Sequence, residues 1–121
     1  MASLGRVLIA DDEGALLLVL TIFLRREGYE CDYADDTKTV IEMLSSTKYD
    51  LLITDISMHG NSETEPIKNL SEIAKSIPVI MMTGNPSDIS KIHSIKQKEK
   101  ACILKPFEFK ELLQQVRVFI K

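Results

Sequence analysis

The chain has 121 residues, which is enough for one domain with a buried core. Hydrophobic residues make up 45% and charged residues 27%, a balance that is typical of soluble globular proteins and excludes an intrinsically disordered chain. The net charge of -3 gives no overall basic excess for direct nucleic-acid binding, with a local basic patch left open. The longest apolar run, Ala15 to Leu20, is too short to span a membrane.

Short apolar runs alternate with amphipathic segments along the chain. Strands are predicted at residues 6–10, 29–34, 49–55, 78–83 and 101–104. Helices are predicted at residues 14–27, 37–46, 66–75, 86–96 and from 108 almost to the end. Gly28 is expected to end the first helix, and Asp35 or Asp36 to cap the second. This alternation predicts an α/β fold with a parallel sheet, and we expect residues 1–121 to form a single domain.

The first helix has more apolar residues than one buried face needs. The predicted core face consists of Leu16, Val19, Leu20, Phe23 and Leu24. The apolar residues that fall largely outside this face are Leu17, Leu18 and Ile22. A contiguous apolar patch on a surface helix indicates a contact with a partner or a second copy, with incidental partial burial as the alternative.

Two isolated cysteines, Cys31 and Cys102, lie among apolar residues and lack the spacing of a metal site. We expect both to be buried free thiols. Because the N-terminus also has no export signal, we expect a cytoplasmic location.

Polar side chains follow four of the five predicted strands. Asp11 and Asp12 follow the first, Asp55 ends the third, Thr83 ends the fourth and Lys105 follows the fifth. Since ligands collect at the carboxyl ends of parallel strands, these groups are expected to converge. Clustered carboxylates repel one another unless a cation is present, and Mg²⁺ prefers oxygen ligands. A carboxylate can also be a nucleophile, so the pattern predicts Mg²⁺-dependent phosphoryl transfer to an aspartate.

Four strings resemble the response-regulator receiver family of two-component signal transduction. They are VLIADDE at residues 7–13, LLITDISM at 51–58, PVIMMTG at 78–84 and LKPF at 104–107. The resemblance covers the whole chain. It implies a flavodoxin-like, doubly wound fold with five helices and a five-stranded parallel sheet of strand order 2-1-3-4-5.

The resemblance also implies roles for single residues. Asp55 would be the phosphoacceptor and a metal ligand, and the other Mg²⁺ ligands would be Asp11, Asp12 and the backbone carbonyl of Ser57. The catalytic partners of Asp55 would be Thr83, which supplies a switch hydroxyl, and Lys105, which binds phosphate. The family further implies a cis peptide bond between Lys105 and Pro106.

The implied function is a phospho-accepting switch that catalyses its own phosphorylation and dephosphorylation, and not an enzyme for other substrates. The expected donor is a sensor histidine kinase or a histidine phosphotransfer protein. The expected readout is a surface formed by the fourth helix, the fifth strand and the fifth helix, which binds a downstream protein or an output domain that this sequence lacks. A homodimer is left open, and no contact with nucleic acid or membrane is expected.

Two features depart from the family pattern. Cys102 stands where the family usually has Tyr or Phe, and the segment from His59 to Pro66 lacks the usual Met-Pro and Asp-Gly pairs. The alternative is therefore a pseudo-receiver that binds partners without phosphorylation. A hydrolase of the haloacid-dehalogenase type is disfavoured, because it needs an acid where Ser57 stands.

Overall fold

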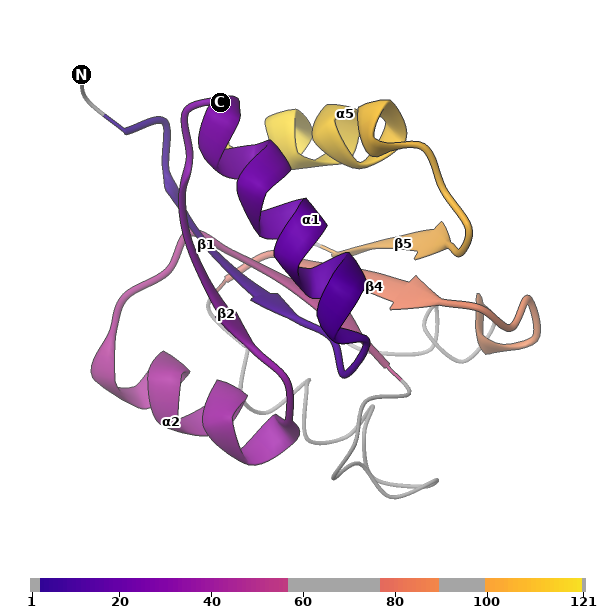
Figure 1. The fold of residues 1–121 in the computed structure, drawn as a ribbon, viewed down its shortest axis with the longest axis horizontal. Helices are drawn as coiled ribbons and strands as arrows, with labels where there is room; N and C mark the ends of the chain where they lie inside the picture. The colour runs from indigo at the N-terminus through magenta and orange to yellow at the C-terminus, as the bar shows by residue number, and fades with distance from the viewer. Residues whose placement is uncertain (1–2, 57–76, 90–99, 121) are drawn as a thin grey trace.

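The computed structural model describes residues 3–56, 77–89 and 100–120 (Figure 1). Within these residues, five parallel strands form one sheet with the order β2-β1-β3-β4-β5. The strands are β1 (Arg6–Ala10), β2 (Glu30–Ala34), β3 (Leu51–Asp55), β4 (Val79–Thr83) and β5 (Lys100–Leu104). The predicted fold class and strand order are confirmed.

Helices cover both faces of this sheet. They are α1 (Gly14–Arg26), α2 (Thr37–Ser46) and α5 (Phe109–Phe119). Figure 1 shows α1 and α5 together on one face and α2 on the other, as expected for a doubly wound sheet. The predicted helix at 66–75 and most of the one at 86–96 lie outside the described residues.

The core has two parts because successive side chains of a strand point to opposite faces. The α1–α5 side contains the strand residues Val7, Ile9, Leu51, Ile53, Ile80 and Met82. The α2 side contains Leu8, Ala10, Leu52, Val79 and Met81. Every residue of β3 and β4 is buried, which explains why both strands begin with apolar runs, followed by Thr54 and Asp55 in β3 and by Thr83 in β4.

The core face of α1 agrees with the prediction only in part: Leu20 and Leu24 are buried, and Leu16 and Phe23 are partly buried against the core. Its buried residues are Leu17, Leu20, Thr21 and Leu24. Val19, predicted to be buried, has 44% of its surface exposed, whereas Leu17, predicted to lie off the face, is 4% exposed. Leu18 and Ile22 are exposed, as predicted. The outward face of α1 therefore presents Leu18, Val19 and Ile22.

Local signals in the sequence are largely confirmed. Asp36 caps α2 by accepting a hydrogen bond of 2.7 Å from the backbone N–H of Thr39. Gly28 follows α1 with a φ of 104°, a left-handed conformation that glycine adopts without steric cost. Cys31 and Cys102 are free thiols, but only Cys31 is buried, since Cys102 is half-buried. No helix in the described part of the chain is long and apolar enough to cross a bilayer.

Candidate functional site

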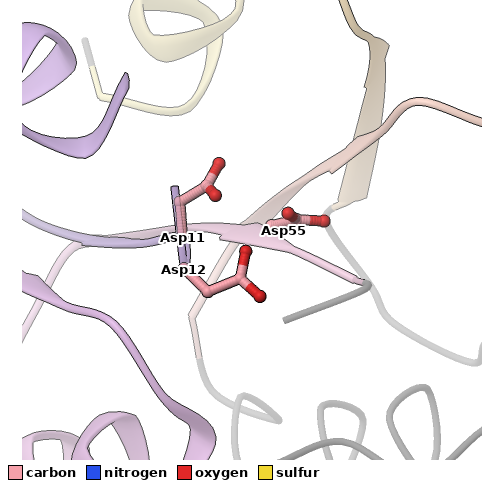
Figure 2. A group of neighbouring side chains, drawn as sticks. All are labelled: Asp11, Asp12 and Asp55. Atoms are coloured by element: carbon pink, nitrogen blue, oxygen red, sulfur yellow. The ribbon is translucent and has the colours of Figure 1, made fainter. Parts of the chain in front are cut away.

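Three aspartates meet at the carboxyl ends of two central strands. Asp11 and Asp12 follow β1, and Asp55 is the last residue of β3, which pairs with β1. One carboxylate oxygen from each aspartate lies within 4.8 Å of the others. Figure 2 shows the three side chains together at this edge of the sheet, which is called the rim below. Asp11 and Asp55 are buried, and Asp12 is exposed, so the group opens to solvent on the Asp12 side.

Lys105 connects two of these carboxylates. It follows β5 at the same rim, and its backbone N–H donates a hydrogen bond of 2.7 Å to the carbonyl of Thr83. Its Nζ lies 2.7 Å from Oδ2 of Asp11 and 3.1 Å from Oδ2 of Asp55. A single ammonium therefore links β1 and β3 through their acids.

Burial and charge act in opposite directions here. Burial raises the pKa of Asp11, and this effect outweighs the hydrogen bonds that Asp11 accepts from Lys105 and from the backbone of Glu13. Burial lowers the pKa of Lys105, but its contacts with Asp11 and Asp55 outweigh this and raise it overall. Lys105 therefore stays charged, but its single positive charge cannot balance a group of three carboxylates.

Thr83 ends β4 beside this group. Its side chain is buried, and it lies one residue beyond Met82, which pairs with Asp55 across the sheet. Oγ1 of Thr83 donates a 2.7 Å hydrogen bond to Oδ2 of Asp88 and accepts one of 3.1 Å from the backbone N–H of Asn85. Asp88 was not among the residues predicted for the site. The string from Asn85 to Asp88 is typical of a turn, and nothing in it indicates a contact back to the strand.

A cavity of about 380 Å³ adjoins the site. It lies between the segments that follow β1 and β5, and its lining residues are Glu13, Leu16, Lys105, Pro106 and Phe107. The peptide bond between Lys105 and Pro106 is cis, as predicted. The cavity gives access to the Lys105 side of the rim.

The structure thus brings together Asp11, Asp12, Asp55 and Lys105, with Thr83 at the end of the neighbouring strand. Ser57, the remaining predicted ligand, lies outside the described residues, as does the unusual segment from His59 to Pro66. The three carboxylates supply the oxygen donors that a hard divalent cation prefers.

Comparison with known proteins gives a consistent family assignment. Residues 7–117 match the family model described as the response regulator receiver domain. The sensory transduction protein RegX3 of Mycolicibacterium smegmatis is 30% identical over 115 residues, which are 95% of this chain and 50% of RegX3. This chain therefore spans about half the length of the curated relatives that it matches first.

Solved structures agree with the fold. The response regulator TrrA of Thermotoga maritima, in complex with Mg²⁺-BeF, has a TM-score of 0.79 and 32% identity, with 94% of this chain and 97% of TrrA covered. The receiver domain of the sensor histidine kinase PA1611 of Pseudomonas aeruginosa, with a magnesium ion in its active-site cleft, has a TM-score of 0.81. It is 20% identical, with 98% of each chain covered, so it supports the fold alone.

Proposed function

Because the chain belongs to the response regulator receiver domain family, we propose that it is a phospho-accepting switch of a two-component or phosphorelay system, with Asp55 as the acceptor. One observation carries the proposal. Asp55 ends the central strand β3 with its carboxylate held 3.1 Å from the Lys105 ammonium, inside a group of three acids. A nucleophile, a cation for phosphoryl oxygens and a set of metal ligands thus share one rim.

The chemistry follows from these side chains. An oxygen of Asp55 attacks the phosphorus of a phosphohistidine, the P–N bond breaks, and the departing imidazole takes the bonding electrons. Lys105, already next to Asp55, pairs with a phosphoryl oxygen once Asp55 carries the acyl phosphate. The Thr83 hydroxyl is the second donor for these oxygens. Each chain accepts one phosphoryl group and later loses it to water, so the domain acts on itself and is not an enzyme for other substrates.

The acidic group fits a divalent cation. Three oxygens within 4.8 Å of one another, with one ammonium to offset them, leave excess negative charge at the rim. We propose Mg²⁺ as the cofactor, held by Asp11, Asp12 and Asp55 with the Ser57 carbonyl. When bound, it supplies charge neutralisation for the phosphoryl oxygens.

The proposed donor is a sensor histidine kinase or a histidine phosphotransfer protein. Its support is the outward apolar face of α1, where Leu18, Val19 and Ile22 are 56%, 44% and 43% exposed. The helix begins at Gly14, directly after the acidic residues, and Leu16 lines the cavity beside Lys105. A donor that docks on this face would bring its phosphohistidine to Asp55.

The proposed output is a change at the surface of the fourth helix, β5 and α5, read by a downstream protein or an output domain. The unit that responds is taken as one receiver domain, residues 1–121, in the cytoplasm. A homodimer through an exposed face is a further option. The alternative, a pseudo-receiver, would leave the pairing of Lys105 with Asp11 and Asp55 without a chemical role.

Phosphorylation with a small phosphodonor tests the proposal. The protein is incubated with Mg²⁺ and phosphoramidate, and intact-protein mass spectrometry follows the mass of the chain. We expect one phosphoryl group per chain, lost in Asp55→Asn and retained in the control Asp35→Asn, which changes an exposed aspartate after β2. No incorporation would favour the pseudo-receiver, and sustained release of phosphate over many turnovers would favour a hydrolase.

A further inference from the structure

The proton of the Thr83 hydroxyl is already engaged. A hydroxyl has one proton to donate, and Oγ1 of Thr83 lies 2.7 Å from Oδ2 of Asp88. The other acceptor in reach, the carbonyl oxygen of Asn85, is more distant at 3.4 Å. The short hydrogen bond to a carboxylate is the stronger of the two, because the acceptor is ionised.

The turn after β4 holds Asp88 in this position. The side-chain oxygen of Asn85 accepts hydrogen bonds of 3.0 Å from the N–H and 2.9 Å from the Oγ of Ser87. The backbone carbonyl of Asn85 accepts one of 3.0 Å from the N–H of Asp88. The chain therefore folds back at once after Thr83, and the Asp88 carboxylate returns to the end of the strand that it follows.

Asp88 also lies close to Cys102. Burial raises the pKa of the Cys102 thiol, and the negative charge of Asp88 raises it further. Cys102 belongs to β5 and pairs with Met81 of β4. A small, half-buried thiol that senses the charge of Asp88 thus lies three residues before Lys105.

We propose that Asp88 is a positioning residue that holds the Thr83 hydroxyl in the unphosphorylated chain, and that a phosphoryl group on Asp55 competes with Asp88 for this hydroxyl. When Thr83 turns to the phosphoryl group, Asp88 and the turn at residues 86–89 are released. The inference rests on the proposed function of Asp55. In this inference, the Asp88 carboxylate links the state of Thr83 in β4 to the segment that follows. Cys102 is too small to provide this link by moving as an aromatic side chain would.

Charge favours this exchange. A phosphoryl group brings about -1.5 to -2 charges and three strong acceptor oxygens. It therefore attracts the Thr83 proton and repels the Asp88 carboxylate at the same time. Removing Asp88 frees the hydroxyl in advance, so less of the binding energy of the phosphoryl group is used to break an existing contact.

Beryllofluoride binding measures the competition, because this anion is a stable mimic of an acyl phosphate. Its dissociation constant in the presence of Mg²⁺ is determined by calorimetry for the wild type, Asp88→Ala and Asp88→Asn. We expect Asp88→Ala to bind about tenfold more tightly, the size of one hydrogen bond to a charged group. Asp88→Asn should fall between the two, because its amide oxygen can still accept from Thr83 without the charge.

Two controls separate the hydroxyl contact from other effects. Glu42→Ala removes an exposed carboxylate of α2 that has no part in this turn, so its affinity should equal that of the wild type. In a Thr83→Ala background, Asp88→Ala should have no effect on affinity. Circular dichroism and thermal unfolding verify that each variant is folded.

The possible results are distinct. If the wild type binds beryllofluoride and Asp88→Ala binds it equally well, the inference is wrong and the proposed function stands. If Asp88→Ala tightens binding as much without the Thr83 hydroxyl as with it, the effect is general charge repulsion and the inference is again wrong. If the wild type binds no beryllofluoride, the proposed function itself fails.

Discussion

Lys105 and its two acids dominate the electrostatics of the site at the scale of single residues. The ammonium contacts Asp11 and Asp55 at 2.7 and 3.1 Å, in a place where little water can screen the charges. Replacing the cation would leave two buried carboxylates side by side. Lys105 therefore offsets the repulsion between the acids of β1 and β3.

The residues of this rim could be predicted because each stands at the end of an apolar run. Because the strands are parallel, their carboxyl ends meet at one edge of the sheet, and this places Asp11, Asp55 and Thr83 there. Asp88 could not be predicted in the same way, because its contact with Thr83 depends on hydrogen bonds within the turn that carries it. Turn residues of this kind are found in many loops without any such contact.

Tyr49 offers a test of pH dependence at the opposite end of the sheet. Its hydroxyl donates a 2.6 Å hydrogen bond to Asp32, and burial, followed by this bond, raises the pKa of Tyr49 to about 12. A phenol that holds its proton more tightly when folded loses stability as pH rises from 10 to about 12. We expect Tyr49→Phe to lower the free energy of unfolding by about 1–2 kcal/mol at neutral pH and to remove this alkaline slope.

Urea unfolding measured at neutral and alkaline pH gives the comparison. Tyr33→Phe is the matched control, because the Tyr33 side chain is 53% exposed and loss of its hydroxyl should leave the stability nearly unchanged. An equal alkaline slope in the wild type and in Tyr49→Phe would contradict the assignment.

At the scale of elements, α1 shows where sequence patterning is ambiguous. The buried residues are Leu17, Leu20, Thr21 and Leu24, of which only Leu20 and Leu24 belong to the predicted face. Thr21 made the true face look polar, but its hydroxyl donates a 2.7 Å hydrogen bond to the carbonyl of Leu17 within the helix. Because that bond satisfies the hydroxyl, the side chain can be fully buried, and the apolar pattern alone could not distinguish the two faces.

Adjacent leucines in α1 should respond very differently to truncation. Leu17 is 4% exposed and packs in the core, whereas Leu18 is 56% exposed. We expect Leu17→Ala to lower the free energy of unfolding by about 2–5 kcal/mol, through lost burial and the cavity that remains. Leu18→Ala should change it by less than about 0.5 kcal/mol. Chemical denaturation of both variants measures the difference, and similar losses would show that the register of the helix is wrong.

At the scale of the whole molecule, the fold could be predicted because local pattern and topology agree. Five apolar strands with helices between them leave few arrangements, and the right-handed crossover rule limits these further. The site then follows from the fold. The sequence could not predict how much these acids destabilise the folded state, because that depends on how deeply Asp11 and Asp55 are buried.

Metal binding should therefore stabilise the entire domain. Burial raises the pKa of Asp11, so its ionised form weakens the folded state at neutral pH. We expect Asp11→Asn to melt a few degrees higher than the wild type in a chelator, with about 4 °C for each kcal/mol gained. Mg²⁺ should raise the melting temperature of the wild type and have little effect on the variant.

Differential scanning calorimetry with and without Mg²⁺ makes this comparison, with Asp35→Asn as the control for loss of an exposed charge. The advantage of Asp11→Asn should shrink as pH falls, because a protonated Asp11 is also neutral. A variant that melts below the wild type in chelator would show that the contact with Lys105 outweighs the burial of the acid.

The strand order has a consequence for motion. β3 lies in the middle of the sheet, between β1 and β4, whereas β5 is an edge strand with most of its residues only partly buried. Local opening is rarest in the centre of a sheet and commoner at its edges. Asp55, the proposed acceptor, therefore ends a central strand of the described sheet, where local opening is rarest, whereas Lys105 follows an edge strand. A change of charge at Asp55 can therefore alter the position of Lys105 and the end of β5 while β3 itself stays in place.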